Sequence, residues 1–578
     1  MLMNTERDLP KHLMVLTALL QGLCLFLLHQ AIELEFWPHH SPRWLFAFYS
    51  FVFTFPTMLL LSIEKGRVTQ LLKWILPFSL IAAMLGYYTG SQVITSFRYD
   101  YSSLLAPLVL CISIGAFKVL MYAQQWGSGS NISYHGLFLW SWRNFLTLGL
   151  SLVFAGSVWA VLMLWGALFE SLDISFFMDL FTERWFFYPA IALANGFGVI
   201  IFRSLTQVID VIRRVQQALM KFLLVLLVFV SLLFLAALPL TGLSSLWESG
   251  GSTLILWMQA LMLFFTNAVY QDEPDNRPYP IWIHRFLYIG LALLPIYSII
   301  SFYGLYIRVE QHGWSVSRGW GFLTWTILAL FAVGYLWGIL KYKDNWLEQL
   351  SRVNVGMGIV VLAAVLLVSS PFMDFRKISV ASQLARVENA ELTLENLDIR
   401  YFHRHLAKPG HTALQKLKSE HETSDTHFAM RIDVLLKDNS EDSEAQLKAR
   451  FLAALEQPGE PAPQPLIESI LKSHVRYWSI DSVLAWYLVA VDADQDGKSE
   501  YLFVTKRKSD HTESKLSFSA AFYYLEKKDV WAYQSVNDNW GNEGATEAFF
   551  HALLSGDIEP KQPRWPDLQI GEQRLEIR

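Results

Sequence analysis

The sequence predicts an α-helical polytopic membrane protein of about eleven transmembrane helices, followed by a soluble C-terminal α+β domain. Three observations support this fold class. Hydrophobic residues make up 53% of the 578 residues, above the roughly 45–50% of soluble domains, and charged residues only 17%. Many apolar runs are about 20 residues long, which matches the hydrocarbon thickness of a bilayer at about 1.5 Å per helical residue. The charges gather in short loops and in the last third of the chain.

The first apolar run covers residues 12–32. It follows a polar start with Arg7 and Lys11, as the core of a signal peptide does. It is longer than such a core, however, and the residues that follow, Glu33-Leu-Glu-Phe36, include no small-residue cleavage site. We therefore expect this run to remain in the protein as its first transmembrane helix.

Ten further runs have the length and composition of transmembrane helices: 43–63, 71–90, 104–123, 144–170, 185–202, 218–241, 252–271, 284–306, 319–340 and 354–373. The weakest is 185–202, because it contains Pro189, Asn195, Gly196 and Gly198. A broken or re-entrant segment is the alternative for this run. Its loss would reverse the side of every later loop, so the basic residues of the loops decide the count.

The basic residues are unevenly divided between the predicted loops. With the N-terminus in the cytoplasm, the inside loops carry fifteen Lys and Arg residues and the outside loops five. This bias satisfies the positive-inside rule and holds on both sides of the run 185–202. We therefore keep eleven helices and predict a transmembrane domain over 1–373 and an extracytoplasmic domain over 374–578.

The predicted extracytoplasmic domain begins where the composition becomes polar, after Met373. Its clearest pattern is a β-type run, Val483-Leu-Ala-Trp-Tyr-Leu-Val-Ala-Val491, which is followed by similar runs at 501–505 and 518–525. Helical patterns precede these runs, so the domain is predicted to be α+β with an antiparallel hairpin. Both cysteines of the chain, Cys24 and Cys111, lie in apolar runs instead, and we expect no disulfide.

Three groups of short strings are distinctive in combination. They are Leu164-Trp-Gly-Ala-Leu-Phe169 with Phe177 and Leu180-Phe181, Asn267-Ala-Val-Tyr-Gln-Asp272 with Pro278-Tyr-Pro280, and Tyr306-Ile-Arg308 with His312-Gly-Trp314 and Arg318. On these strings the chain resembles a bacterial inner-membrane family catalogued as domain of unknown function 4153. The resemblance implies a many-helix fold in a Gram-negative-type inner membrane, and it implies no reaction or catalytic residue. In such a membrane, the extracytoplasmic domain that the loop charges predict is periplasmic. One departure is His312-Gly313, where such proteins often have Tyr-Gly.

Composition and motifs exclude or weaken several functions. The net charge of -5 gives no electrostatic footprint for a nucleic-acid partner. The sequence contains no Walker A loop, dinucleotide glycine fingerprint, Gly-x-Ser-x-Gly elbow or His-Glu-x-x-His motif. These absences weaken ATPase, dehydrogenase, serine hydrolase and zincin functions, and we favour a role other than enzyme.

The substrate candidates lie in one loop and in three helices. The external loop 170–184 mixes Asp173 and Asp179 with phenylalanines, as an interfacial amphipathic helix does, and it precedes the interrupted run 185–202. Polar groups at membrane depth add Asn195, Asn267 and Arg308 as candidates for a substrate path. The alternative is packing, because Asn side chains also join transmembrane helices.

A second function is indicated by Glu33 and Glu35 in the first external loop. Membrane glycosyltransferases that use polyprenyl-phosphate sugars place a pair of acidic residues there, although the pair is also an ordinary interfacial feature. A third function is a membrane sensor or scaffold with a periplasmic sensing domain. Eleven helices and the lack of a cytoplasmic output domain argue against a sensor, so we favour transport, flippase-like or envelope-related function for a small-molecule or lipid substrate.

The most specific local motif is Asp492-Ala-Asp-Gln-Asp-Gly-Lys-Ser-Glu500. Carboxylates at Asp492, Asp494 and Asp496 alternate before Gly497, as in the first half of an EF-hand loop. The twelfth position is Phe503 instead of the EF-hand glutamate. With β-type runs on both sides, the motif resembles the calcium-binding hairpin loops of integrin-like repeats, in which the ninth position, here Glu500, closes the shell. We expect a structural calcium site, with an ion-free acidic turn as the alternative.

Overall fold

The computed structural model of the chain describes residues 9–94, 102–127, 132–242, 251–270, 278–343, 346–394 and 396–421 of the helical part. Of the remainder it describes 428–429, 432, 435–436, 448, 451–452, 455–458, 462–473, 483–493, 499–508, 516–527, 530–536, 552–553, 555, 568–570 and 573–575. The chain divides into two compact units, Met1–Ile432 and Asp433–Arg578. Each unit is described by itself.

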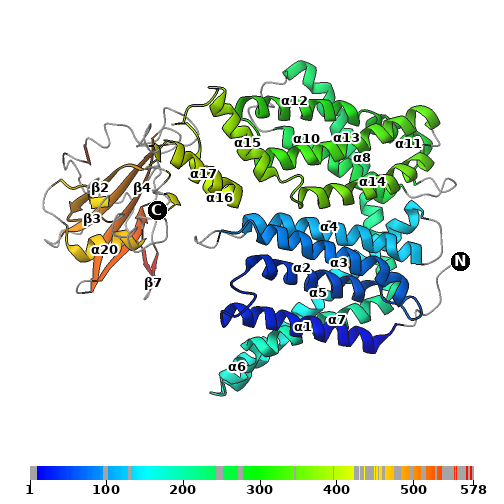
Figure 1. Cartoon of the computed structure of the whole chain (residues 1–578), viewed down its shortest axis with the longest axis horizontal. Coiled ribbons are helices and arrows are strands. Elements are labelled where there is room, and N and C mark those ends of the chain that lie inside the picture. The colour runs from blue at the N-terminus through cyan, green and yellow to red at the C-terminus, as the bar shows by residue number, and fades with distance from the viewer. Residues whose placement is uncertain are drawn as a thin grey trace. The chain divides into compact units, whose positions relative to one another are not determined.

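Within the described residues of the first unit, eleven segments are long and apolar enough to cross a membrane. This confirms the predicted class and number of spans. The ninth segment consists of two consecutive helices, α11 and α12, and a ribbon view is given in Figure 1. The spans are α1 (Lys11–Glu33), α2 (Pro42–Ser62), α3 (Val68–Gly90), α4 (Ser102–Gly127), α5 (Tyr134–Glu170), α7 (Arg184–Ser204), α8 (Thr206–Thr241), α10 (Gly251–Val269), α11 (Ile281–Ala292) with α12 (Leu294–His312), α13 (Val316–Tyr342) and α14 (Leu347–Val368).

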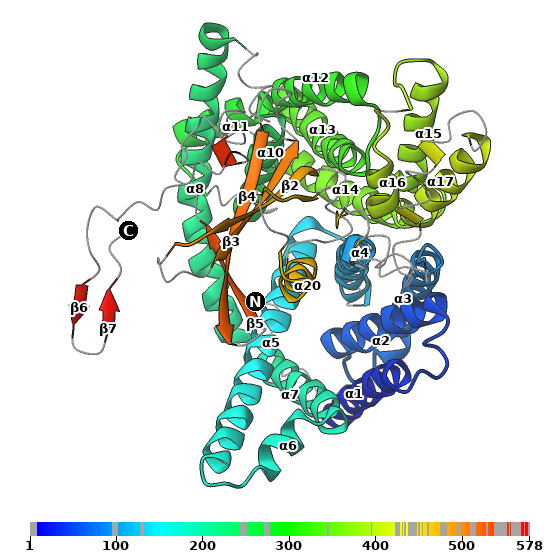
Figure 2. The same ribbon diagram turned by 90° about the vertical axis from the view of Figure 1, so that its left-hand side faces the viewer.

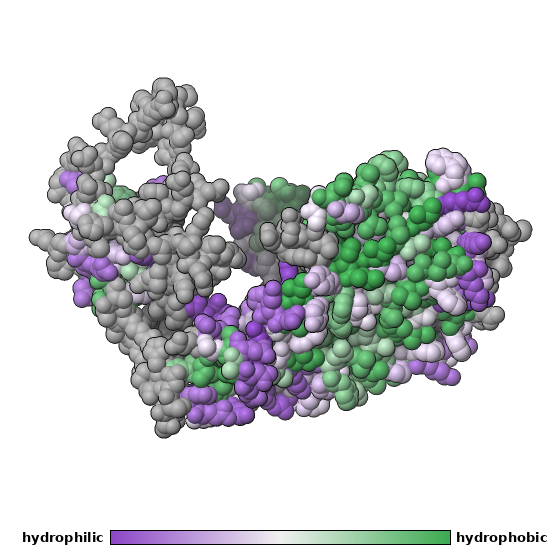
Figure 3. Space-filling model, turned by 90° about the horizontal axis from the view of Figure 1, so that it is seen from above, coloured by the Kyte–Doolittle hydropathy of each residue, from purple (hydrophilic) through white to green (hydrophobic). Residues whose placement is uncertain are grey.

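The surface of the helical unit is apolar. Large hydrophobic side chains such as Leu164, Trp257 and Ile299 are more than half exposed. Figure 3 shows hydrophobic residues over one face of this unit, with hydrophilic residues gathered toward its ends. Such a surface is unfavourable in water and suits contact with lipid. The chain is therefore an integral, multi-pass helical membrane protein in a bilayer.

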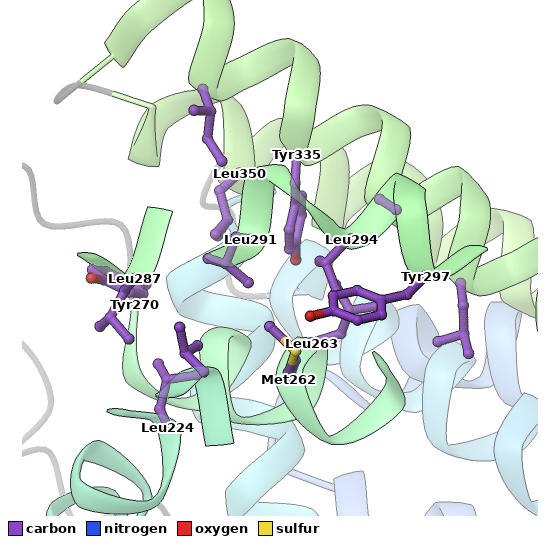
Figure 4. Close-up of a cluster of buried hydrophobic side chains, with 14 of the residues drawn as sticks. Leu224, Met262, Leu263, Tyr270, Leu287, Leu291, Leu294, Tyr297, Tyr335 and Leu350 are labelled. Carbon is purple, nitrogen blue, oxygen red and sulfur yellow. The ribbon is translucent and has the colours of Figure 1, made fainter. Parts of the chain in front are cut away.

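The helices form two groups, each with a core of its own. The first core joins α1, α2, α3, α4 and α7 through residues such as Met14, Leu60 and Ile75. The second joins α8 and α10–α14 through residues such as Leu291 and Tyr335, and Figure 4 shows part of it. The groups meet where α4 and α5 contact α14 and where α5 contacts α8 (Figures 1 and 2).

Helix α7 covers the weakest of the predicted runs, and it is continuous from Arg184 to Ser204 through Pro189. Its glycines lie at close contacts with other helices. A β-carbon at Gly196 would lie 2.5 Å from Ala18 Cβ of α1, and one at Gly198 would lie 2.9 Å from Ser151 Cα of α5. Small residues allow this close approach in membrane proteins. The glycines that made the run look interrupted are therefore packing residues.

Four further helices complete the described first unit. The short helix α6 (Phe176–Thr182) follows α5 within the predicted interfacial loop. After the last span come α15 (Phe375–Glu388), α16 (Ile399–His405) and α17 (Ala407–His421), of which α15 contacts both α13 and α17. In Figure 1, α15 and the start of α1, which begins at Lys11, lie at opposite ends of the helix bundle, with the start of α1 on the side of the label N. This placement agrees with an odd number of spans.

The second unit contains a five-stranded sheet in the order β1-β2-β3-β4-β5. Its strands are β1 (Leu455–Glu456), parallel to β2 (Val483–Val491), followed by antiparallel β3 (Glu500–Lys508), β4 (Leu516–Lys527) and β5 (Val530–Val536). Alternate residues of β2 are buried on opposite faces, with Trp486 and Leu488 against helix α20 (Gln464–Ser473) and Tyr487 and Val489 on the other. A short pair, β6 (Leu568–Ile570) and β7 (Gln573–Leu575), stands apart from this sheet. The predicted α+β class and hairpin are confirmed.

Candidate functional site

The candidate site is a cavity of about 380 Å³ within the helical unit. It lies where the two helix groups meet, because α4 and α5 of one side and α10, α13 and α14 of the other supply its wall. Lys118, Tyr134 and Asn267 on this wall belong to the halves of their helices nearest Gly127, Tyr134 and Val269. Those are the helix ends on the side of Lys11. The cavity therefore belongs to the half of the bundle that the charge bias predicts to be cytoplasmic.

Most of the wall is aromatic. Helix α5 contributes Phe138, Trp142 and Phe145, which are spaced four and three residues apart and therefore share one helix face. Phe264 of α10 and Phe331 of α13 line the cavity from the other helix group. An apolar wall of this kind with few polar groups is typical of ligand sites in proteins.

Lys118 of α4 is the cation on this wall. It lies nine residues before the end of α4 at Gly127, or about 13 Å along the helix axis. A lysine at the centre of a transmembrane helix costs about 2.5–3.5 kcal/mol on insertion scales. Among the described residues its ammonium forms no hydrogen bond or ion pair that would offset this cost. The remaining compensation for this cost is contact of the ammonium with whatever the cavity contains.

A network of three polar side chains joins α10, α13 and α14 beside the cavity. The hydroxyl of fully buried Tyr335 lies 2.5 Å from Asn267 Oδ1 and 2.6 Å from Asn354 Oδ1, and shares its single hydrogen between them. Asn354 Nδ2 donates to Asn267 Oδ1 at 2.7 Å. If one of the two amides were rotated by 180°, two nitrogens or two oxygens of Asn267 and Asn354 would face each other. If both were rotated, the Tyr335 hydroxyl hydrogen would lose both of its acceptors, so the network favours the orientation described here.

The network leaves one group of Asn267 unused. Its Oδ1 faces Tyr335 and Asn354, and its main-chain oxygen accepts a hydrogen bond of 2.6 Å from the Tyr134 hydroxyl. The Nδ2 group, with two donor hydrogens, meets no acceptor among the described residues. Asn267 is half-buried and lines the cavity, so this donor is available to a ligand.

The other predicted substrate residues lie away from this cavity. Asn195 Oδ1 accepts a hydrogen bond of 2.9 Å from Ser151 and joins α7 to α5. Arg308 lies on α12 near its end at His312, whereas Asp173 and Asp179 are exposed in the turn after α5 and on α6. Of the five, the structure places only Asn267 on the cavity wall.

The two acidic residues of the first external loop have different surroundings. Glu33 ends α1, forms an ion pair of 3.2 Å with Arg184 and is hydrogen-bonded to His29 Nε2 at 3.1 Å. Glu35 is exposed and has a left-handed backbone with φ of 52°. Neither lines the cavity, which belongs to the other half of the bundle. Glu33 holds the end of α1 to the start of α7.

The predicted calcium ligands are described in part. The hairpin pairs Val491 with Glu500, and Ala493 N donates to Glu500 Oε2 at 2.9 Å. Asp492 is exposed at the end of β2, whereas Asp494 and Asp496 lie outside the described residues. Where the structure describes the chain, no group of three or more His, Cys, Asp or Glu side chains is placed to hold a metal ion.

A second polar cluster lies at the opposite end of the helical unit. Buried Asp374 accepts hydrogen bonds of 2.9 and 2.8 Å from the Arg376 guanidinium and 2.7 Å from the Tyr88 hydroxyl. Burial opposes ionisation of the carboxyl, but the hydrogen bonds and charge of Arg376 outweigh it and hold the pKa of Asp374 below its usual range. All the partners belong to the chain itself, so this cluster fastens α15 to α3.

The comparison with known families rests on most of the chain. A family described as Domain of unknown function (DUF4153) matches residues 15–417. The chain belongs to this family. No curated protein and no solved structure matches the chain. The family match runs past the last span into α17, so α15 and α16 are part of the family's region, as they are of the compact helical unit.

The strings that carry the family resemblance have three different environments. Trp165, Phe169, Phe177 and Phe181 form an aromatic cluster between α5 and α6. The turn that contains Gly313 is held by α15, since Gln383 Nε2 donates 2.8 Å to the main-chain oxygen of His312. The remaining string contains Asn267 and Tyr270, and only this one reaches the cavity.

The departure at His312 has a simple structural reading. Its main-chain oxygen accepts from Gln383 and, at 3.4 Å, from Arg318 Nη1. A main-chain acceptor is available from any residue type, so Tyr or His at this position satisfies the same contacts. The role of the position is to hold the turn between α12 and α13.

Lys118 is the site residue that the sequence analysis missed. It is a single charge inside the apolar run 104–123 and contributes to no loop, so the loop charge count passes over it. The signal was nevertheless present, because an ionisable residue within a transmembrane segment is by default a functional candidate. Asn354 and Tyr335 stood out less, because Asn354 is the first residue of the predicted run 354–373 and Tyr335 is an uncharged aromatic residue within the run 319–340.

Proposed function

We propose that this protein moves a small-molecule or lipidic substrate across a bacterial inner membrane and binds it in the cavity between the two helix groups. The observation that carries the proposal is Lys118, a cation that lies on the wall of a 380 Å³ cavity and has no partner among the described residues. A group kept at this cost inside a membrane usually faces a substrate path. A lysine that is fully buried for structural reasons is, by contrast, almost always paired.

The division into two helix groups supports transport over simple binding. Each group has a hydrophobic core of its own, so each can move as a body while the seam between them changes. Alternating access in transporters is largely such rocking of one bundle against another around a central site. In the state described here, the cavity is in the half of the bundle on the side of Lys11.

The proposed topology has the N-terminus in the cytoplasm and the chain after residue 374 in the periplasm. The support is the fifteen-to-five division of basic residues between the loops. With this orientation, the cavity described here lies on the cytoplasmic side. Transport then requires a second state in which the cavity is reached from the periplasm.

Cysteine accessibility tests alternating access without knowledge of the substrate. Ser141 lines the cavity, and the chain has only Cys24 and Cys111 to remove by substitution with alanine. In this background Ser141→Cys should react with a membrane-impermeant maleimide rapidly in inverted vesicles and more slowly in intact spheroplasts. Reaction from the same side only, in every preparation, would contradict transport and would be consistent with a binding site alone.

Two cysteines at exposed positions serve as controls for sidedness. Ser171 follows α5 in the predicted periplasmic loop, and Ser204 ends α7 at the predicted cytoplasmic end. Ser171→Cys should react only from outside and Ser204→Cys only from inside. The opposite pattern would contradict the proposed topology, whatever the result at position 141.

A structural calcium ion at the hairpin Asp492–Glu500 is a separate proposal. The antiparallel pairing of β2 and β3 brings Asp492 and Glu500 to the same end of the hairpin. Carboxylates arranged in this way suit weak calcium sites of extracellular modules, which bind at roughly 10⁻⁴–10⁻³ M.

A melting experiment on the full chain tests the calcium site. Calcium should raise the melting temperature of the natural protein. Asp492→Asn should abolish this increase, whereas Asp179→Asn should preserve it. An equal increase in both variants would contradict the site.

A further inference from the structure

The cavity presents two donor groups that meet no acceptor in the described part of the chain. The Lys118 ammonium and the Asn267 Nδ2 group carry three and two donor hydrogens, and neither meets an acceptor among the described residues. No Asp or Glu belongs to the described residues that line the cavity. A ligand that satisfies both groups must therefore supply acceptor oxygens, and an ammonium favours acceptors that are negatively charged.

The rest of the wall makes the opposite demand. The wall is formed by aromatic side chains, among them Phe138, Trp142, Phe145 and Phe331. A polar ligand would lose its hydration against this wall and would gain no hydrogen bond from it in return. An apolar chain fits this surface and displaces water from it. The ligand must then be polar at one end only.

The size of the cavity limits the ligand further. A volume of about 380 Å³ is at the lower end of the range of about 300–1,000 Å³ for drug-sized ligands. It accommodates a head group with one short chain more readily than a lipid with two long chains, the second of which would have to remain in the bilayer.

We infer that the cavity binds an amphiphile with a single anionic head group, phosphate or carboxylate, which contacts Lys118 and Asn267 while its apolar chain lies against the aromatic wall. This inference rests on the proposed function and adds the substrate class to it. Tyr335 and Asn354 act as positioning residues, because they fix the Asn267 amide with its donor toward the cavity.

Binding of defined probes tests the substrate class. The full chain in nanodiscs of zwitterionic phosphatidylcholine is titrated with dodecyl phosphate, and binding is followed by tryptophan fluorescence, since Trp142 lines the cavity. Dodecyltrimethylammonium, with the same chain and the opposite charge, and inorganic phosphate, with the head group alone, should each bind at least tenfold more weakly. Equal binding of the cationic probe would overturn the inference.

Variants of the lysine locate the site. Lys118→Met should weaken dodecyl phosphate binding about tenfold or more, because it removes a charge-assisted contact. Lys118→Arg keeps the charge and should remain within about threefold of the natural protein. Lys73→Met, at an exposed lysine of neighbouring α3, should bind as the natural protein does. An unchanged affinity in Lys118→Met would place the probe elsewhere.

Two sources of such a ligand are separated by the lipid of the nanodisc. If anionic phospholipid of the bilayer occupies the cavity, adding phosphatidylglycerol to the nanodiscs should compete with dodecyl phosphate. If the natural ligand is a single-chain amphiphile, phosphatidylglycerol should not compete, whereas dodecanoate should. Either result supports the head-group chemistry, and competition by neither would overturn it.

The binding and accessibility experiments fail independently. Selective binding of dodecyl phosphate together with one-sided labelling at position 141 would support the inferred ligand class and contradict transport. Two-sided labelling without selective binding would preserve transport and overturn the ligand class.

Discussion

Two polar clusters in the same helical unit differ in what they leave unsatisfied. At one end, Asp374 receives hydrogen bonds from Arg376 and Tyr88, so that donors and acceptor all belong to the chain. At the other, Tyr335 and Asn354 occupy the oxygen of Asn267, while the Asn267 amide nitrogen and the Lys118 ammonium meet no acceptor among the described residues.

This difference indicates that the Asp374 cluster stabilises the fold, whereas Lys118 and Asn267 bind a ligand. Buried polar groups are ordinarily satisfied within the protein, and a satisfied cluster contributes to stability. A cluster that keeps donors facing a cavity gives up some stability and retains the capacity to bind an acceptor. Substitutions at the Asp374 cluster should therefore act mainly on stability, and substitutions of Lys118 mainly on binding.

The largest expected effect is that of Asp374→Ala. The change leaves Arg376 without its partner in a largely buried setting, which costs about 3 kcal/mol of unfolding free energy. Melting of the purified full chain, followed by tryptophan fluorescence, measures the loss. Asp398→Ala, which removes only the exposed cap of α16, should cost about 1 kcal/mol. Equal losses in the two variants would contradict a fastening role for Asp374.

The pH dependence of stability should arise at the Asp374 end of the unit. Burial, with help from neighbouring His411 and Arg404, lowers the pKa of His403 on α16 to about 4 from an ordinary value of 6.5. The unfolded chain then binds a proton that the folded chain does not, so stability should fall as pH falls from about 6.5 to 4. The expected loss is about 2 kcal/mol, less than the full shift because the ring is half-buried.

Glutamine variants check the source of this pH dependence. His403→Gln should reduce the loss of melting temperature between pH 6.5 and 4, whereas His405→Gln, at an exposed histidine of the same helix, should not. Asp374 adds a separate window. Because its folded-state pKa is depressed, its stabilisation persists above about pH 4 and is lost as pH falls further. An identical pH profile in both histidine variants would contradict the assignment to His403.

A smaller effect on stability is expected from Tyr335→Phe. Loss of the hydroxyl removes the contacts to Asn267 and Asn354 and should cost about 1 kcal/mol. It should also weaken dodecyl phosphate binding about threefold, because the Asn267 amide is no longer held. Tyr297→Phe is the matched control, since that buried hydroxyl donates to Ser231 O at 2.6 Å away from the cavity. It should lose similar stability and keep its affinity.

The smallest change in stability is expected for Lys118→Met. The substitution removes a cation that has no partner among the described residues and adds an apolar side chain of similar length. The melting temperature of the ligand-free protein should stay the same or rise, by the equivalent of up to about 1 kcal/mol. A loss as large as that of Asp374→Ala would mean that Lys118 is a structural residue, and the comparison between the clusters would fail.

The sequence predicts the spans well because span length and loop charge are local properties. All eleven predicted runs overlap the eleven spans found among the described residues. Glycine was harder to interpret, because Gly196 and Gly198 suit both an interrupted helix and close packing, and only the positions of Ala18 and Ser151 decide between them.

The site was less predictable because it is assembled from distant parts of the chain. Asn267 stood out as a polar residue at membrane depth, but its partners Tyr335 and Asn354 are 68 and 87 residues further along. Nothing in the spacing of these residues indicates that they meet. Lys118 was detectable as a lone charge in an apolar run, yet only the structure shows that it lines a cavity and meets no partner in the part of the chain that is described.

The most direct test of the central claim is the lipid that accompanies the purified protein. The natural chain, Lys118→Met and Lys73→Met are purified from the same bacterial membrane in neutral detergent, and bound amphiphiles are extracted and quantified by mass spectrometry. The natural chain and Lys73→Met should retain anionic amphiphiles in excess over zwitterionic ones, and Lys118→Met should lose that excess. The same excess in Lys118→Met would contradict a cavity that selects an anionic head group through Lys118.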